Sequence, residues 1–248
     1  GGTEPLLAGP DPAATTPGPT PSPIATPVPT PVPPRMLGGY RWPLTRGRLT
    51  TNFGPTGGAT WVVDGERFHD GIDIASFCGD TIRAAHDGVV LVAGRRFDRY
   101  LGWDGSLETY EARVTQRGGW GRFPITVVVD DGNGYRSIYA HPSHAIVRRG
   151  DRVRAGDPIG REGRTGHATG CHLHYGIFSP LDPRRFALRA DLVAKWGLPA
   201  REIARIDPRD VLPPRPRTIR LGWGVTPVDE VSPVLRRMEA IEARLGDD

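Results

Sequence analysis

The sequence contains few cysteines, lysines and methionines, and it has no long hydrophobic run. Two cysteines and two methionines occur among 248 residues, and Lys195 is the single lysine among 32 basic residues. No stretch of 18 apolar residues is present, so no membrane-spanning helix is predicted. The net charge of +4 rests on arginine and is accompanied by no nucleic-acid-binding motif. The arginine excess is typical of coding bias, and no nucleic-acid partner is expected.

Residues 1–36 form a segment of different composition from the rest. They include 12 of the 26 prolines, mostly in Thr-Pro, Val-Pro and Ser-Pro steps. So little apolar surface cannot pack, which predicts a disordered, polyproline-like stalk. The chain does not start with a basic and then apolar signal sequence. Stalks of this kind are typical of exported proteins, so we expect an extracytoplasmic location in the cell envelope, with the protein either secreted or tethered to the membrane by this stalk. A lipid or signal anchor ahead of residue 1 is a further hypothesis.

From Tyr40 onward, short β-type runs alternate with glycine-containing turns. The runs are TWVVDG, DGIDIA, TIRAA, DGVVLVAG, ITVVVDDGNG and YRSIYAH. Their alternation and their Asp-Gly and Asn-Gly pairs predict a mainly β, antiparallel fold, a β-sandwich of the barrel-sandwich (duplicated hybrid) type. We therefore predict a domain over 37–182, in which about 97–117 is an inserted loop, and a C-terminal extension over 183–248. Helices in that extension, at 185–197 and after Ser232, are expected to pack on or beside the domain.

The segment VRRGDRVRAGDPIG, at 147–160, resembles the crossing-strand turn of barrel-sandwich folds. Biotinyl and lipoyl carriers share that turn, which raises the alternative of a swinging-arm carrier. Such a carrier needs a modifiable lysine on an exposed hairpin. Lys195 lies in a predicted helix instead, so the carrier alternative is rejected.

All seven histidines lie between residues 69 and 174. In the run CHLHYG, His172 and His174 share one face of a predicted strand, about 6–7 Å apart. His69 and Asp73 would stand about 13 Å apart on a straight strand. They can hold one ion only if the chain bends at Asp70-Gly71. A catalytic zinc site takes three such ligands and leaves one position open, but the pattern alone does not select one histidine of the pair.

Three motifs in order carry a family resemblance. FHDGIDIA, YRSIYAH and GRTGHATGCHLHYG resemble the signature blocks of the lysostaphin-type zinc endopeptidases of bacterial cell walls, and the turn segment lies between the last two. The resemblance covers about residues 42–180. It implies a zinc-dependent endopeptidase that hydrolyses peptide bonds of peptidoglycan, with the peptide part of peptidoglycan as its partner. We expect a monomer with one zinc ion per chain.

The resemblance also implies a role for each motif residue. His69, Asp73 and His174 are expected to bind zinc. His141 and His172 are expected to flank the metal-activated water and the scissile peptide as proton carrier and oxyanion stabiliser, in an order that stays open. Some relatives keep the fold without turnover and act as wall-binding regulators or activators of other hydrolases. Here the ligand set is complete, which favours an active peptidase.

Two further groups of residues are candidates for substrate binding. His167, in the TGHATG loop, lies beside the expected site. The 97–117 insertion has three aromatic residues, Tyr100, Trp103 and Tyr110, whose rings could stack on glycan or peptide. A surface decoration with no contact to substrate is the equally weighted alternative for this insertion.

The two cysteines lie near the expected ligands. Cys78 follows Asp73 by five residues, and Cys171 directly precedes the HLH run. If the ligands meet at one ion, their neighbours are drawn together, and an exported protein favours a disulfide. Two buried free thiols, or an additional metal ligand, are the alternatives.

Overall fold

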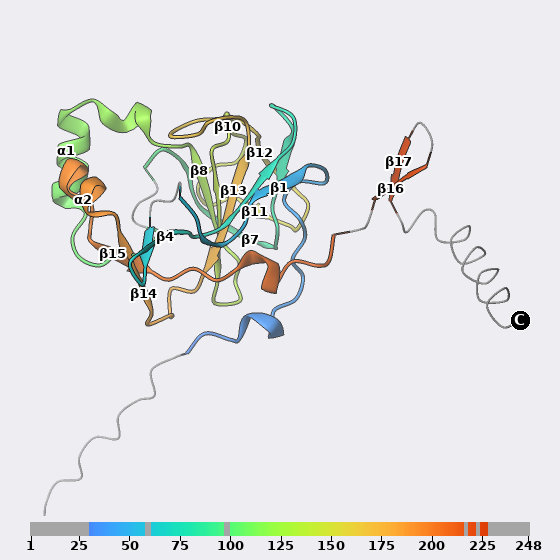
Figure 1. Cartoon of the computed structure of the whole chain (residues 1–248), viewed down its shortest axis with the longest axis horizontal. Helices are drawn as coiled ribbons and strands as arrows, with labels where there is room; N and C mark the ends of the chain where they lie inside the picture. Colours follow the sequence, from blue (N-terminus) through green and yellow to red (C-terminus); the bar gives the residue numbers. More distant parts are fainter. Residues whose placement is uncertain (1–29, 58–60, 97–99, 216–217, 222–223, 228–248) are drawn as a thin grey trace, which may run out of the picture.

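The structure is a computed structural model that describes residues 30–57, 61–96, 100–215, 218–221 and 224–227 (Figure 1). Most of the predicted stalk and the predicted helix after Ser232 lie outside these residues. Within them, η1 (Pro34–Met36) is a single 3₁₀ turn ahead of the first strand. Neither α-helix of the described part is long and apolar enough to cross a membrane.

A seven-stranded sheet forms the centre of the molecule, and every neighbouring pair in it is antiparallel. Each of the six predicted β-type runs contains a strand of one of the sheets, because the alternating β-branched residues suit a half-buried pleated surface. In spatial order the central strands are β1 (Arg48–Thr51), β5 (Ile72–Ala75), β13 (Leu173–Phe178), β9 (Arg136–Ala140), β8 (Thr126–Asp130), β7 (Gly88–Gly94) and β11 (Arg152–Val153).

Three smaller sheets complete the part of the fold that the structure describes. The first contains β10 (His144–Ala145), β12 (Pro158–Arg161) and β6 (Thr81–Arg83). The second contains β15 (Arg201–Ile203), β14 (Arg185–Leu188), β3 (Trp61–Val63), β4 (Glu66–His69) and β2 (Gly54–Pro55). The third is a hairpin of β16 (Thr218–Leu221) and β17 (Gly224–Pro227). The mainly β, antiparallel prediction is confirmed.

The main core lies between the central sheet and the three-stranded sheet. Val127 and Val129 of β8 are fully buried there, together with Ile82 of β6 and Ile159 of β12. Val128 points the other way because successive side chains of a strand alternate between faces. Two sheets that share one apolar core make the sandwich that the sequence predicts.

The opposite face of the central sheet is also covered. Val128, Ile138 and Phe178 pack there against Leu101 and Ile203. Leu101 lies in the insertion and Ile203 in β15, so the insertion and the C-terminal extension form a third layer over this part of the sheet. An antiparallel sheet can leave one face in water, but this one does not do so here.

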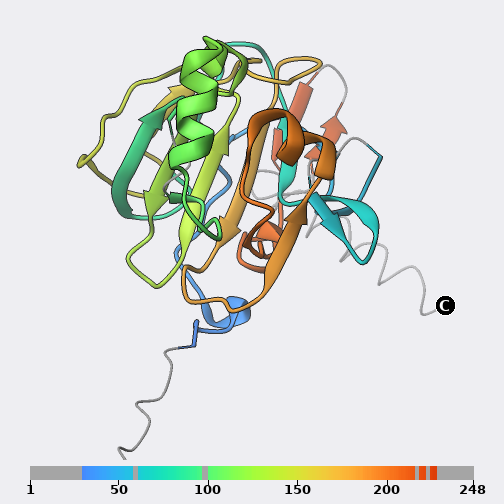
Figure 2. The ribbon, with the colours of Figure 1, turned by 90° about the vertical axis from the view of Figure 1, so that its left-hand side faces the viewer.

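The insertion is more than a loop. It contains α1 (Glu108–Gln116), and η3 (Gly119–Arg122) follows it. Tyr110 and Val114 of α1 form a small core with Leu188 and Leu198 of the C-terminal extension, and Trp120 and other partly buried aromatics surround it. Figures 1 and 2 show α1 beside α2 (Ala190–Trp196). Apolar partners far along the chain therefore hold the insertion in place.

The predicted helix over 185–197 is wrong in its first part. Residues Arg185–Leu188 form β14, which pairs with β3 on one side and with β15 on the other. The helix begins only at Ala190 and ends before Gly197, which has a left-handed φ of 73°. Cross-strand pairing overrides the local helical pattern. Around η4 (Pro208–Asp210) the extension contributes Ile206, Val211 and Leu212 to the main core.

Asp131 is a buried carboxyl group in the main core. Tyr40 and Ser137 donate hydrogen bonds of 2.8 Å each to its Oδ2 atom, and Oδ1 has no hydrogen-bond partner. Burial raises the pKa of Asp131 to about 8, although the two hydrogen bonds oppose this rise. The folded protein therefore keeps a proton that the unfolded chain releases near pH 4.

We predict that this proton makes stability depend on pH. Because the folded-state pKa is raised, the free energy of unfolding should fall as pH rises from about 4 to about 8, by on the order of a few kcal/mol. The Asp131→Asn variant cannot ionise at this position, so it should lack this pH dependence and be more stable than wild type at pH 8 but not at pH 5. Urea unfolding at pH 5 and pH 8 measures the free energy of unfolding of both proteins. Glu66→Gln, on the exposed part of β4, is the control. Equal pH dependence in wild type and Asp131→Asn would contradict the prediction.

Candidate metal centre

The chain bends between His69 and Asp73, as the shared-ion hypothesis requires. His69 is the last residue of β4 in the five-stranded sheet, and Asp73 lies in β5 of the central sheet. Asp70 and Gly71 connect the two strands. A side chain at Gly71 would place its Cβ 2.5 Å from the Tyr175 carbonyl oxygen and 2.8 Å from Cε1 of His174. Glycine is therefore required for β5 to lie this close to β13.

Strand register brings the third candidate ligand to the same point. His174 of β13 lies directly opposite Asp73 in the antiparallel pair. The distance is 3.0 Å from His69 Nε2 to His174 Nδ1, and Asp73 Oδ1 lies 3.1 Å from each of these nitrogens. These three residues form a group of potential metal ligands whose donor atoms lie within 4.8 Å of one another.

The three donor atoms fit a zinc ion. Tetrahedral zinc with bonds of about 2.0–2.1 Å holds its ligand atoms about 3.3 Å apart, close to the spacing in this cluster. The second nitrogen of each histidine faces an acceptor: His69 Nδ1 donates to the Asn52 carbonyl oxygen at 2.9 Å, and His174 Nε2 lies 3.2 Å from Asp70 Oδ1. These partners leave His69 Nε2 and His174 Nδ1 free to bind a metal. Two imidazole nitrogens and one carboxylate are a typical donor set for catalytic zinc.

The electrostatics of the cluster favour a cation. Burial opposes ionisation of Asp73, yet hydrogen bonds from His174 and His69 hold the pKa of its carboxyl well below the usual range. Burial also opposes a charge on His174, but the carboxylates of Asp70 and Asp73 raise its pKa to about 10. The same negative field that attracts a proton to His174 attracts a metal ion, which competes with that proton.

His141 and His172 lie beside the cluster as an adjacent pair. Their ring centroids are 4.6 Å apart, and His172 Nε2 lies 3.9 Å from Asp73 Oδ1. His141 Nδ1 donates to the Thr165 carbonyl oxygen at 2.7 Å, and His172 Nδ1 donates to that of Gly170 at 3.0 Å. Each ring therefore keeps Nε2 as the nitrogen available for proton transfer. Burial lowers the pKa of His141 to about 4, so this imidazole is neutral at pH 7.

The backbone at His141 is unusual. Its φ is +74°, a left-handed conformation that residues other than glycine seldom adopt. The amide of His141 donates to the carbonyl oxygen of Ile125, just before β8, and its own carbonyl accepts from the Thr165 amide. These contacts hold the backbone of the residue in place directly after β9. Strained backbone of this kind concentrates at functional sites.

The candidate substrate residues lie in different environments. His167 is exposed in the loop between Gly166 and Gly170, where a ligand could reach it. Tyr110 is 0% exposed in the small core with α2, so its ring has no face left for stacking on substrate. Tyr100 and Trp103 are partly buried and pack on the outer face of the central sheet. These aromatic residues stabilise the insertion.

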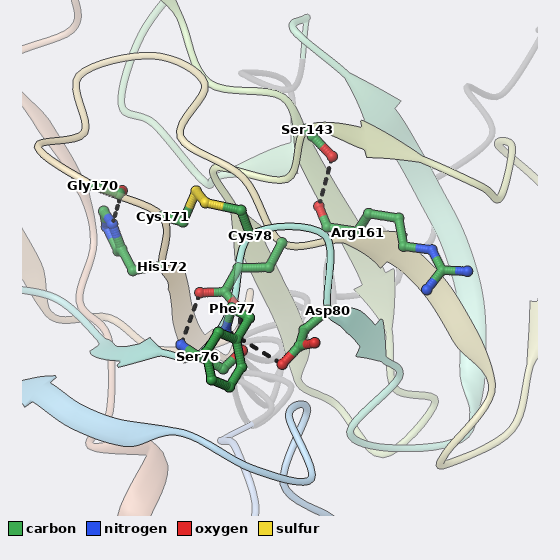
Figure 3. Close-up of a disulfide and its surroundings, with 10 residues drawn as sticks. Ser76, Phe77, Cys78, Asp80, Ser143, Arg161, Gly170, Cys171 and His172 are labelled. Carbon is green, nitrogen blue, oxygen red and sulfur yellow. Dashed lines mark hydrogen bonds between the residues drawn. A yellow bond between two sulfur atoms is a disulfide. The ribbon is translucent and has the colours of Figure 1, made fainter.

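Cys78 and Cys171 form a disulfide, with 5.4 Å between their Cα atoms. Figure 3 shows that it links the turn after β5 to the segment just before β13, next to His172. Glu162 supports the same turn, because its carboxylate accepts a hydrogen bond of 3.0 Å from the Ser76 amide and a second one from the Ser76 hydroxyl. The disulfide thus joins two of the three segments that carry candidate ligands. The alternatives of free thiols or a cysteine ligand do not apply to this structure.

Reasoning from the sequence missed the residues that support the ligands. Asn52 acts through its carbonyl oxygen, which any residue could supply, so its identity gave no signal. Asp70 lies between two predicted ligands, and its acidic side chain was the one available hint. Arg205 and Glu202 approach Asp70 from more than 130 positions away in sequence, and no local pattern marks them.

The close approach at Gly71 leads to a prediction. We expect Gly71→Ala to force β5 and β13 apart beside His174, to destabilise the protein by about 1–3 kcal/mol, and to weaken zinc binding at least tenfold. Gly121→Ala is the matched control, since an added Cβ at Gly121 meets nothing within 4 Å. Thermal unfolding and zinc titration of both variants measure the effects. Wild-type zinc affinity in Gly71→Ala would show that this approach does not hold the site together.

The antiparallel sheets bring two histidines and one aspartate to a single point, and two more histidines lie alongside. This arrangement defines a candidate mononuclear metal site of the hydrolytic type. Comparison with known proteins agrees with this class. Residues 67–183 match the model of peptidase family M23, and these residues include all five site residues. The domain formed by this part of the chain belongs to peptidase family M23, the lysostaphin-type family.

Curated relatives and solved structures of this family are similar to parts of the chain. The DD-carboxypeptidase/endopeptidase Mpg of Neisseria meningitidis is 36% identical over 109 residues, which are 44% of this chain and 20% of that protein. The peptidoglycan DD-endopeptidase ShyA of Vibrio cholerae is 30% identical over 166 residues, or 66% of this chain and 33% of that protein. The matches thus span a fifth to a third of these relatives. The catalytic domain of lysostaphin from Staphylococcus simulans is 24% identical, with 54% of this chain and 81% of that chain covered and a TM-score of 0.38.

Proposed function

We propose that this protein is a zinc-dependent endopeptidase that hydrolyses peptide bonds in bacterial peptidoglycan. The observation that carries the proposal is the convergence of His69 Nε2, Asp73 Oδ1 and His174 Nδ1, with His141 and His172 alongside. One zinc ion per chain is held by the first three residues. When bound, zinc supplies Lewis acidity to the scissile peptide and to the attacking water.

The two flanking histidines carry the proton chemistry. Their Nδ1 atoms are bound to backbone carbonyls, so each offers Nε2 to the substrate. One ring accepts the proton of the attacking water, and the other hydrogen-bonds to the oxygen on which charge develops. The neutral state of His141 at pH 7 suits the part of proton acceptor, since a neutral imidazole with Nδ1–H fixed has a free lone pair at Nε2. The ring that hydrogen-bonds to the developing oxyanion must carry a proton on Nε2.

The names of the two relatives suggest the substrate bond. One is named a DD-carboxypeptidase/endopeptidase and the other a peptidoglycan DD-endopeptidase, so we infer that a direct D,D cross-link between wall peptides is the first bond to test. A disulfide and a wall substrate both favour an extracytoplasmic location. The stalk at 1–36 would then supply reach towards the wall, and the protein is proposed to act as a monomer.

The deciding experiment uses purified protein and isolated sacculi. Sacculi with direct D-alanyl–diaminopimelate cross-links and sacculi with glycine bridges are digested separately, and the products are identified by mass. We expect uncross-linked muropeptides from the first kind, with loss of activity on chelation and recovery with zinc. The His141→Ala/His172→Ala variant is the control. A zinc-loaded protein that binds sacculi but releases no product from either kind would instead support the regulator alternative.

A further inference from the structure

A chain of buried charged side chains leads away from the candidate metal centre. It begins at His174, whose Nε2 lies 3.2 Å from Asp70 Oδ1. Asp70 Oδ2 in turn lies 3.4 Å from Nε of Arg205, and Arg205 donates through a terminal nitrogen to Glu202 at 2.8 Å. None of these contacts is expected from the ligand motif.

These charges are almost completely removed from water. The side chains of Asp70, Arg205 and Glu202 are 3%, 1% and 0% exposed. A buried charge with no partner is strongly destabilising, so each group needs the next one in the chain. Asp70 Oδ1 has no hydrogen-bond partner within the described residues, and the polar atom that faces it is Nε2 of His174, 3.2 Å away in an ion-pair contact.

Arg205 is held from several sides. One of its terminal nitrogens donates to the carbonyl oxygens of Ile203 at 2.9 Å and Leu101 at 3.2 Å. Its guanidinium group lies over the ring of Phe178, 4.3 Å from the centroid. Arginine is suited to this environment because its planar guanidinium group can stack on an aromatic ring and donate hydrogen bonds at the same time. The cation that faces Asp70 is therefore held in position by contacts within the protein.

Arg205, which faces Asp70, and Glu202, which pairs with Arg205, both come from outside the segment that matches the family. Glu202 lies in β15, and Arg205 follows that strand, whereas the family match ends at residue 183. The insertion pairs with the same strand, since the Ile203 amide donates to Gly102 and the Asp104 amide to Arg201, at 2.9 Å each. The insertion and the segment around β15 thus pack together next to Asp70, which faces the candidate ligand His174.

We propose that Asp70 is a positioning residue for His174, and that Arg205 and Glu202, supported by the insertion, hold Asp70 in place. Asp70 accepts the Nε2–H of His174, which fixes the ring orientation and keeps the Nδ1 lone pair towards the metal. The C-terminal segment around β15 is thereby part of the metal site. This proposal rests on the zinc site of the proposed function.

The first test is the zinc affinity of Asp70→Asn in the full-length chain. Loss of a carboxylate that orients a metal-bound histidine typically weakens binding by about 10- to 100-fold, and we expect that range here. Competition with a chromophoric chelator measures the dissociation constant of zinc. The visible spectrum of the Co²⁺-substituted protein reports ligand geometry independently of activity.

Asp182→Asn is the matched control. Asp182 is also a buried carboxylate, 7% exposed, and it pairs with an arginine two residues away at 2.6 Å, but it makes no contact with the ligands. It should leave zinc affinity and the Co²⁺ spectrum unchanged. If Asp70→Asn lowers only the thermal stability of the metal-free protein and leaves zinc affinity within twofold of wild type, the positioning role is wrong.

A double variant tests the role of Arg205 and Glu202 in a protein that is still expected to fold. Glu202→Gln/Arg205→Met removes one charge of each sign, and replacing a buried ion pair in this way is often tolerated. We expect a folded protein with zinc affinity reduced by about tenfold or more and an altered Co²⁺ spectrum. Wild-type affinity in this variant would overturn the role of Arg205 and Glu202. A wild-type chain that binds no zinc would refute the proposed function itself, a result distinct from either failure.

Discussion

Replacing His174 by alanine should abolish zinc binding and hydrolysis together. His174 Nδ1 is one of the three donor atoms that the described residues bring to this point, and without it His69 and Asp73 cannot hold an ion tightly. Zinc content should fall from one ion per chain to near zero, and cleavage of a cross-linked muropeptide should become undetectable. Elemental analysis of the purified variant gives the first value, and product mass spectrometry gives the second.

His172→Ala should differ from His174→Ala in its zinc content, although the two histidines are only two positions apart. It should retain one zinc ion and lose about 10²- to 10⁴-fold in turnover, the usual contribution of a proton-transfer group. The same pattern is expected for His141→Ala. His144→Ala is the control, since His144 is exposed on β10 and should change neither value. If His172→Ala lost zinc while His174→Ala kept it, the two roles within the pair would be reversed.

Removal of the disulfide should produce the largest change in stability. Cys78 and Cys171 are separated by 93 residues, and by the loop-entropy model a closed loop of this length stabilises the protein by about 4–5 kcal/mol. The Cys78→Ser/Cys171→Ser variant should therefore lose most of this amount in urea unfolding at pH 7. It should also bind zinc more weakly, because the disulfide joins the segments that carry Asp73 and His174.

Two controls accompany this prediction. Ser76→Ala removes the hydroxyl contact to Glu162 in the same turn but keeps the disulfide, so its loss should be far smaller. Intact mass with and without reductant, followed by alkylation of the denatured protein, establishes the redox state. Two alkylated thiols in the unreduced protein would contradict the disulfide, and the stability difference would then need another cause.

Local pattern was sufficient for the strands of the central sheet. Val127, Val128 and Val129 alternate between two faces in the structure as strand geometry requires. The pairs Asp64-Gly65, Asp131-Gly132 and Asn133-Gly134 lie between consecutive strands. Local pattern failed at Arg185–Leu188, where the apolar spacing predicted a helix but the segment pairs with the edge of β3 as a strand. It failed again at Tyr110, since an aromatic residue of an insertion looks the same in sequence whether it faces solvent or a second helix.

The sequence by itself determined the candidate ligands, the flanking histidines and the family, because these depend on residue identity and on spacing within short motifs. The tertiary structure alone decided how they meet. His174 lies opposite Asp73 through the register of β5 and β13, and His69 joins them through the bend at Gly71. Arg205 reaches Asp70 because the third layer covers the central sheet. Such contacts are set by packing between distant segments, and no spacing along the chain encodes them.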